Sequence, residues 1–367
     1  MSDTIKIDAA ALAADVAWIA KGKRRPAVPV LGTAQVRITG AGLSLRYTDF
    51  DWFREVIVGS GDGFDSDVAV QVSPAALAGL LKGCKGDAAV TVCDAGVSVG
   101  VGSRTLNVPK AAEVDDFPEW PVFESQAEPA VLESGIIKRG MTSAGTDDTL
   151  PMLTHVFFTG GAMVTTDRFR LSIIRYASDG FSAMVPAGLL KAFTVGTKGE
   201  VVVEHGKLAS MANPAPDQMR VRASAGGRSI VQRVGDHEFP KYQRLIDAAV
   251  EDVAVSGEVN KAQLLAAMGN IGKGDDVQLE WRNDGTMLVQ MRGRFGDVLS
   301  EDTVSVRALA GEGWPLVARY NAPYLASILK GVDAEVITMS TRGAARPMSV
   351  KGSDSDSHLL MPIRIAS

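Results

Sequence analysis

The sequence has few of the residues that form redox or metal sites. Of 367 residues, two are cysteine and four are histidine. The spacing of Cys84 and Cys93 matches neither a redox CxxC pair nor a zinc site, so we expect two buried, reduced thiols. The histidines have no second histidine or carboxylate at the spacing of a metal centre, so we expect no metal and no cofactor. They are His155, His205, His237 and His358.

Long apolar runs are also missing. A helix that spans a bilayer needs about 20 consecutive apolar residues, and no run in this sequence approaches that length. The first residues, Met1–Thr4, lack the basic start and the apolar stretch of a signal peptide. We therefore expect a cytoplasmic protein.

Catalytic patterns are scarce. Neither a P-loop nor an H-E-x-x-H zinc motif occurs. The paired acids Asp115–Asp116 and Asp147–Asp148 could hold a metal ion, but solvation in loops explains them with fewer assumptions. We expect that the protein is not an enzyme.

What the chain does have is an ordinary globular composition with an acidic balance. Hydrophobic residues make up 46% and charged residues 22%, and the formal net charge is −5. A chain of 367 residues is too long for one typical core and indicates two or three domains. Net charge governs solubility, whereas local basic patches decide phosphate contacts. An acidic protein can therefore bind DNA if its basic residues gather on one surface.

A helical motif occurs three times. Each copy begins with proline or a small polar residue, contains leucines, and ends at glycine, which suits the first turn and the C-terminal cap of a helix. The copies are Ser73–Gly83, Val185–Gly196 and Ala322–Gly331, separated by roughly 110 and then roughly 140 residues, a domain-sized spacing. Generic alternation of helices and strands is the alternative interpretation. Three such helices at this spacing favour an internal repeat.

A second set of amphipathic helices is predicted upstream of these, over Asp8–Lys21, Leu132–Ser143 and Asn260–Ile271. Alternating or β-branched runs between the helices predict antiparallel strands and hairpins. The expected fold class is α+β, with three similar domains of two helices and about eight strands each. We expect the domains to cover residues 1–122, 123–248 and 249–367, with linkers near Pro118–Pro129 and Asp247–Glu251.

Six short motifs, in order along the whole chain, resemble the bacterial DNA polymerase III beta subunit, or sliding clamp. Thr166–Leu171 (T-D-R-F-R-L) is similar to the family's T-D-G-H-R-L, and Asp236–Tyr242 is similar to its D-G-x-F-P-x-Y. The end of the chain resembles the family's V-V-M-P-M-R-L. The other matching segments are Arg25–Gly32, Leu43–Asp49, Asp116–Pro118 and, at that end, Leu359–Ile365.

The resemblance implies the DNA-clamp, or processivity, fold and a head-to-tail homodimeric ring around duplex DNA. Helices of this family line the hole, and basic side chains there meet phosphates without reading sequence. A clamp loader, the replicative polymerase and other clamp-motif proteins are the implied partners. A solvated loop is the alternative for the basic cluster after the first helix. The implied DNA-binding residues are Lys21, Lys23, Arg24, Arg25, Lys138, Arg139 and Lys191.

The resemblance also implies a groove between the second and third domains that accepts a Gln-Leu-type peptide motif of the partners. Without the resemblance, Leu153, Leu171 and Leu245 would be interpreted as core residues. The implied groove residues are Leu153, Thr166, Arg170, Leu171, Pro240, Arg244, Leu245, Asn321, Tyr324, Leu359, Met361, Pro362 and Arg364.

For the dimer, the resemblance implies that the edge strand near Arg104, Leu106 and Val108 meets the Ile271 region and the strand at Asp297–Glu301 of the next subunit. Arg168-Phe169 replaces the family's Gly-His, and the loop Asp147–Met152 is more acidic than is usual. These departures fit a diverged, phage- or plasmid-encoded member. They also leave open a scaffold that keeps the clamp fold but no longer encircles DNA.

Overall fold

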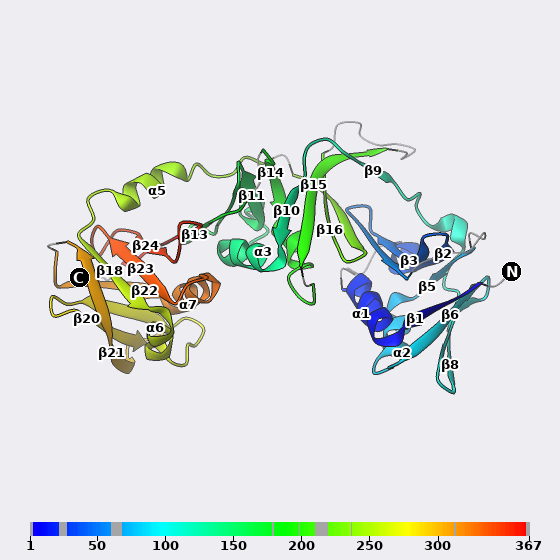
Figure 1. The fold of residues 1–367 in the computed structure, drawn as a ribbon, viewed down its shortest axis with the longest axis horizontal. Helices are drawn as coiled ribbons and strands as arrows, with labels where there is room; N and C mark the ends of the chain where they lie inside the picture. The colour runs from blue at the N-terminus through cyan, green and yellow to red at the C-terminus, as the bar shows by residue number, and fades with distance from the viewer. Residues whose placement is uncertain are drawn as a thin grey trace. The chain divides into compact units, whose positions relative to one another are not determined.

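The computed structural model describes residues 3–21, 28–59, 68–177, 180–197, 199–209, 219–235, 237–311 and 313–364. Its contacts divide the chain into two compact units, Met1–Val131 with Val195–Val234 and Leu132–Thr194 with Gly235–Ser367. The two units are described separately below and are coloured by residue number in Figure 1.

One order of elements, β-α-β-β-β-β-α-β-β-β, occurs three times along the chain. The first copy contains β1 (Asp3–Asp8), α1 (Ala9–Ala20), β2 (Ala34–Thr39), β3 (Gly42–Thr48), β4 (Trp52–Val58), β5 (Val68–Val72), α2 (Pro74–Leu81), β6 (Asp87–Cys93), β7 (Gly96–Val101) and β8 (Arg104–Pro109). The second contains β10 (Ala130–Glu133), α3 (Ser134–Gly140), β11 (His155–Thr159), β12 (Ala162–Thr166), β13 (Arg170–Arg175), β14 (Ala183–Pro186), α4 (Ala187–Lys191), β15 (Glu200–Ala209), β16 (Arg220–Ala225) and β17 (Arg228–Arg233).

The third copy contains β18 (Val255–Asn260), α6 (Lys261–Met268), β19 (Asp276–Trp281), β20 (Thr286–Arg292), β21 (Val298–Ala310), β22 (Leu316–Asn321), α7 (Ala322–Gly331), β23 (Val336–Thr341), β24 (Met348–Lys351) and β25 (Asp356–Leu360). Two elements lie between copies, β9 (Val122–Ser125) and α5 (Gln243–Val250). Short 3-10 turns complete the described elements: η1 (Pro29–Gly32), η2 (Val114–Asp116), η3 (Met141–Ser143) and η4 (Pro151–Thr154).

Four of the predicted helices begin directly after a side chain that caps their first turn. Side-chain oxygens of Asp8, Ser73, Asn260 and Asn321 accept a backbone N–H in the first turn of α1, α2, α6 and α7, respectively. The predicted helix at Val185–Gly196 is shorter than expected, because only Ala187–Lys191 is α-helical. The expected linker Asp247–Glu251 instead contains the last turn of α5.

Strands of the second copy pair with strands of both other copies. In the first unit, β17 pairs antiparallel with β4, which joins β10, β15, β16 and β17 to β2–β5 in one nine-stranded sheet. In the second unit, β13 pairs antiparallel with β25 within a twelve-stranded sheet. These pairings explain why contacts divide the chain into two units, while the element order has three copies. The domain boundaries themselves stay a prediction.

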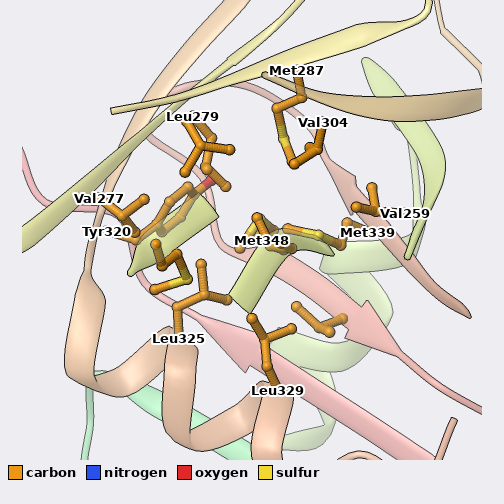
Figure 2. Close-up of a cluster of buried hydrophobic side chains, with 14 of the residues drawn as sticks. Val259, Val277, Leu279, Met287, Val304, Tyr320, Leu325, Leu329, Met339 and Met348 are labelled. Atoms are coloured by element: carbon orange, nitrogen blue, oxygen red, sulfur yellow. The ribbon is translucent and has the colours of Figure 1, made fainter. Parts of the chain in front are cut away.

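The core of the second unit is largest within the third copy. Leu325 and Leu329 of α7 point into a cluster that contains Tyr320, Met339 and Met348 (Figure 2). All five of these side chains are fully buried. Closely packed interiors of this kind lose dispersion contacts and transfer free energy when a side chain is shortened.

Truncation in this core should therefore be costly. We expect Leu325→Ala and Leu329→Ala each to lower the free energy of unfolding by about 2–5 kcal/mol, measured by urea unfolding. The control Val336→Ala shortens a side chain that is 49% exposed and should cost less than about 1 kcal/mol. Losses of equal size in all three variants would contradict the packing shown in Figure 2.

Candidate functional site

A hollow of about 1050 Å³ lies in the second unit among α3, η3, α4, the turn after α6, and α7. Five basic residues line this basic hollow: Lys138, Arg139, Lys191, Lys273 and Lys330. Asp148 is the acidic residue of its lining. The four lysines are exposed. The hollow is therefore a positively charged concave surface on a chain whose net charge is −5.

Arg139 differs from the lysines because carboxylates already hold it. Its Nη1 lies 2.8 Å from Asp333 Oδ2 and 3.7 Å from Asp356 Oδ2, and Asp356 is buried. The Arg139 charge is thus partly neutralised within the protein. The lysines are the residues of the hollow with charge left for a polyanion.

The structure brings together some of the predicted DNA-binding residues. Lys138, Arg139 and Lys191 share the basic hollow. Lys21 lies at the C-terminal end of α1 and is exposed, whereas the cluster from Lys23 to Arg25 lies outside the described residues.

Sequence reasoning missed Lys273 and Lys330, although the repeat contained a signal for both. Lys330 follows an Ile-Leu pair in α7 as Lys191 follows a Leu-Leu pair in α4. Lys273 follows the first helix of its copy, as Lys21 does. A basic residue at one repeat position should have directed attention to the corresponding positions.

The same unit also contains a small cluster of buried apolar residues. Leu171 of β13 lies opposite Leu359 of β25, and both are buried. Val164, Ile173 and Ala249 complete this small cluster, and Phe157, Phe239, Tyr242 and Ile246 pack against it. Helix α5 thereby contributes to an apolar floor beside the β13–β25 pair.

The rim of this floor contains both aromatic and charged side chains. Arg170 donates from Nε to Asp167 Oδ2 at 2.9 Å and from Nη1 to Ser327 Oγ at 3.0 Å, and its guanidinium lies 4.3 Å from the Tyr324 ring centre. The Met361 N–H donates to Phe169 O at 2.8 Å. Phe169 is 52% and Met361 40% exposed. We call Phe169, Leu171, Tyr324, Leu359 and Met361 the apolar patch.

The predicted groove residues fall into two groups. Thr166, Arg170, Leu171, Asn321, Tyr324, Leu359 and Met361 lie in or directly beside the apolar patch; Thr166 Oγ1 donates to Arg170 O, and Asn321 caps α7 at Tyr324 N. Leu153 is buried against Gly145 rather than within the apolar cluster. The remaining predicted residues lie on α5, on the segment before it or on the segment after β25, and are exposed or half-buried: Pro240, Arg244, Leu245, Pro362 and Arg364.

The opposite face of the same strands is buried, and beside the apolar Met163, Ile174 and Leu360 it carries a group of hydrogen-bonded polar side chains. Ser172 Oγ lies 2.6 Å from Ser143 Oγ and 2.8 Å from His358 Nδ1. Thr165 Oγ1 donates to Gly140 O at 2.7 Å. These bonds tie α3 and η3, which line the basic hollow, to the strands of the apolar patch.

The buried serine and histidine do not form an accessible catalytic site. Ser172 and His358 are fully buried, so no substrate reaches them. The stretch Gly96–Gly100 matches the G-x-S-x-G pattern of hydrolases, but it lies inside β7, where Ser98 faces Thr91 of β6 and Asn107 of β8. A nucleophile elbow needs a strand-to-helix turn. Neither group therefore supports a hydrolase.

Other sites that the sequence raised have little support in the part of the chain that the structure describes. No group of three His, Cys, Asp or Glu side chains there is placed to hold a metal ion. No helix there is long and apolar enough for a bilayer. Cys84 and Cys93 are unpaired, as expected, but they are half-buried rather than buried.

The fold is that of the DNA clamps. The DNA polymerase III subunit beta of Pseudomonas aeruginosa covers 99% of this chain and 100% of its own with a TM-score of 0.78 and 19% sequence identity. A Bartonella birtlesii sliding clamp bound to griselimycin covers 100% of both chains, with a TM-score of 0.78 and 17% identity.

Over its whole length the chain is homologous to bacterial beta sliding clamps. The beta sliding clamp of Streptomyces coelicolor is 23% identical over 99% of both chains, and that of Vibrio cholerae is 22% identical over 93% of this chain and 94% of its own. No protein-family model matches the chain.

His358 should make the stability of this unit depend on pH. Burial lowers the pKa of His358 to about 4, against an opposing effect of Asp356. An unfolded histidine has a pKa of about 6.5. As the pH falls from about 6.5 to about 4, His358 therefore becomes protonated in the unfolded chain but stays neutral in the folded one. The free energy of unfolding should fall by roughly 3 kcal/mol over this range.

The measurement is the free energy of unfolding between pH 4 and pH 8 for the unchanged protein and for His358→Gln. We expect the variant to lose less stability on acidification, whatever its stability at pH 8. His205→Gln, which replaces a half-buried histidine of β15, is the control. Equal pH slopes in the unchanged protein and in His358→Gln would show that His358 protonates freely.

Proposed function

We propose that this protein is a DNA sliding clamp, a non-enzymatic, cytoplasmic processivity factor that closes a homodimeric ring around duplex DNA. It receives its place on DNA from a clamp loader, and it tethers the replicative polymerase and other partners through a peptide-binding groove at the apolar patch. Full-length homology to beta sliding clamps and the shared fold support this proposal.

One observation supports the proposal of a closed ring. The pattern of strand pairing between copies is incomplete at both ends of the repeat. The fourth strand of the first copy, β4, pairs with the last strand of the second copy, β17. The corresponding strand of the second copy, β13, pairs with the last strand of the third, β25. Among the described residues, two strands at the corresponding positions lack such a partner: β21, the fourth strand of the third copy, and β8, the last strand of the first. Their pairing between chains would repeat the same joint and close a head-to-tail ring.

The two remaining edges are open among the described residues. Strand β8 is the end strand of the sheet β1-β6-β7-β8. Val298–Ser305 of β21 pair with β20 on one side, whereas pairing with β18 begins at Val306. Open edges of this length favour association with another strand.

Side-chain charge also favours this pairing. Arg104 of β8 is exposed, and so are Glu301 and Asp302 of β21. Val298 and Leu299 add exposed apolar surface next to these acids. Of the other predicted interface residues, Leu106 and Val108 are buried in their own chain and Ile271 packs on the core of the third copy. In this proposal these three residues pack beneath the two edge strands, and backbone hydrogen bonds between the strands form the interface.

The basic hollow supports the proposed contact with DNA. Four exposed lysines on one concave surface can meet phosphates without selecting a sequence, which a protein that slides requires. A closed ring leaves DNA only when it opens or reaches a free end. The contacts between the lysines and the phosphates therefore need not be strong. In this proposal the domains are 1–122, 123–248 and 249–367, as the sequence predicts.

Retention on DNA tests encirclement directly. The protein is loaded onto nicked circular DNA with a bacterial clamp loader, the circle is then cut, and dissociation is followed on both forms. We expect rapid loss from linear DNA and retention on circles, because only free ends release a closed ring. A known beta clamp loaded in parallel is the control. Equal loss from both forms would contradict the proposal and favour a scaffold that no longer encircles DNA.

The proposed joint predicts a charge-sensitive dimer. Glu301→Lys with Asp302→Lys should raise the dimer dissociation constant at least about tenfold, because the new lysines would oppose Arg104. Sedimentation equilibrium measures the change. Glu335→Lys with Asp354→Lys, which changes the net charge equally on exposed residues outside β21, is the matched control. A dimer that is equally stable in both double variants would place the interface elsewhere.

A further inference from the structure

The strands β18, β23 and β24 of the third copy present two faces that differ in composition. On one face, Ile337, Met339 and Val350 belong to the core that α6 and α7 also line, and Figure 2 shows Met339 there. Their neighbours point to the opposite face, because successive residues of a strand alternate. That face has a hollow of about 240 Å³. We call it the serine hollow, since three serines line it: Ser256, Ser340 and Ser349.

The strand register arranges polar groups in a square at this hollow. Ser340 of β23 lies directly opposite Ser349 of β24, and two residues along the strands Thr338 lies directly opposite Lys351. Opposite residues have Cβ atoms about 4.5–5.5 Å apart, and residues two apart on a strand are separated by about 6.5–7 Å. All four side chains line the hollow. Ser256 of β18, opposite Ser340, adds a further hydroxyl beside the square.

Two of these hydroxyls are buried without a protein partner. Ser349 is 2% and Ser256 9% exposed, and neither hydroxyl forms a hydrogen bond with a residue that the structure describes. Their oxygens are not among the fully enclosed polar atoms, so they open into the hollow that they line. Buried polar groups of proteins almost always have a hydrogen-bond partner. The hollow therefore offers hydrogen bonds to a molecule that occupies it.

Lys351 gives the serine hollow a positive charge. Its side chain is exposed and forms no ion pair with a described residue. Glu258 lies opposite Thr338 in the same row, but Arg307 already holds it in an ion pair. An ammonium group repels cations, and hydroxyl and ammonium donors together favour a ligand with several acceptor oxygens. The chemistry of the hollow thus fits an oxyanion.

We propose that the serine hollow is a binding site for a phosphate group, with the Lys351 ammonium and the three hydroxyls of the square donating to its oxygens. Donors at four corners suit a tetrahedral group better than a planar carboxylate, which has only two oxygens. The five heavy atoms of phosphate need at most about 150 Å³ if each takes the roughly 30 Å³ of a water in the liquid, so the hollow is large enough.

This site is independent of the proposed clamp function. The serine hollow and the basic hollow share no lining residue. The phosphate group can be inorganic phosphate or the phosphate ester of a side chain on another protein, and the donors are the same in both cases.

Amide NMR spectra of the deuterated full-length protein test the proposal, because they report on each site separately and the basic hollow also attracts phosphate. Inorganic phosphate is titrated at constant ionic strength, with chloride as the reference anion. We expect the Ser340 resonance to shift saturably. Ser349→Ala should raise the dissociation constant measured at Ser340 at least about tenfold, the size expected of a hydrogen bond to a charged group. Lys351→Gln should weaken binding by a similar factor.

Two matched variants control for these changes. Ser98→Ala removes the hydroxyl of a half-buried serine in β7, and Lys85→Gln removes an exposed charge, both in the first unit. Neither should change the dissociation constant measured at Ser340.

A tripeptide with blocked ends and a central phosphoserine between two glycines distinguishes the two sources of phosphate. Tighter binding of this peptide than of inorganic phosphate, without binding of the unphosphorylated peptide, would support the site and assign it to a phosphorylated partner. Binding of inorganic phosphate alone would support the site and assign it to the free ion.

Three results would overturn the proposal. They are shifts at Ser340 that do not saturate, shifts that chloride reproduces, and binding that neither Ser349→Ala nor Lys351→Gln weakens. Each would mean that the hydroxyls of the serine hollow are satisfied by water alone. Retention on circular DNA would be unaffected by any of them.

Discussion

The alternation of side chains along β12, β13 and β25 is the constraint on which the rest of the second unit depends. Successive residues of a strand point to opposite faces. Leu171 and Leu359 therefore lie in the apolar cluster, whereas their neighbours Ser172 and His358 form a buried hydrogen bond on the other face. A slip of one residue would exchange these faces and break the buried hydrogen bond between Ser172 and His358. The hydrogen bonds among Ser143, Ser172 and His358 hold the register.

This arrangement gives one layer of strands two different tasks. On the polar face, Ser172 and Thr165 fix η3 and the end of α3, from which Lys138 and Arg139 reach the basic hollow. On the apolar face, the same strands carry the patch that we propose to bind peptides. The two surfaces therefore share a layer of strands, and Ser327 in the lining of the hollow also accepts a hydrogen bond from Arg170 at the rim of the patch. The proposed contacts with a polymerase and with DNA can then coexist in one molecule.

Much of the fold could be predicted from local signals. Asp8, Ser73 and Asn260 begin helices because their side chains cap the first turn, and the sequence displays this directly. The repeat was likewise visible in three short helices. Helix α5 was missed because it begins without a side-chain cap and because its last turn lies in the segment interpreted as a linker, Asp247–Glu251.

The sites were predicted less completely, because they depend on contacts between distant residues. Arg139 was interpreted as a cation for DNA, but Asp333, 194 residues away, holds it. Leu153 stays a predicted groove residue, and its burial beside Gly145 follows from tertiary packing. No sequence pattern reports such pairings. The sequence does show that Lys273 and Lys330 correspond to basic residues of the other copies.

The two surfaces also use different cations, and the difference matches their proposed tasks. The basic hollow presents lysines, and its one arginine is paired with Asp333. An ammonium group is a compact charge on a flexible stem, without a fixed direction of hydrogen bonding. Such groups follow phosphates that pass in any register, which suits sliding. The rim of the apolar patch presents guanidinium groups, Arg168 and Arg170, in contact with aromatic rings. A planar donor fixed by a ring favours one geometry. A surface that must choose among partners gains from that constraint, and a surface that must let DNA move would be slowed by it.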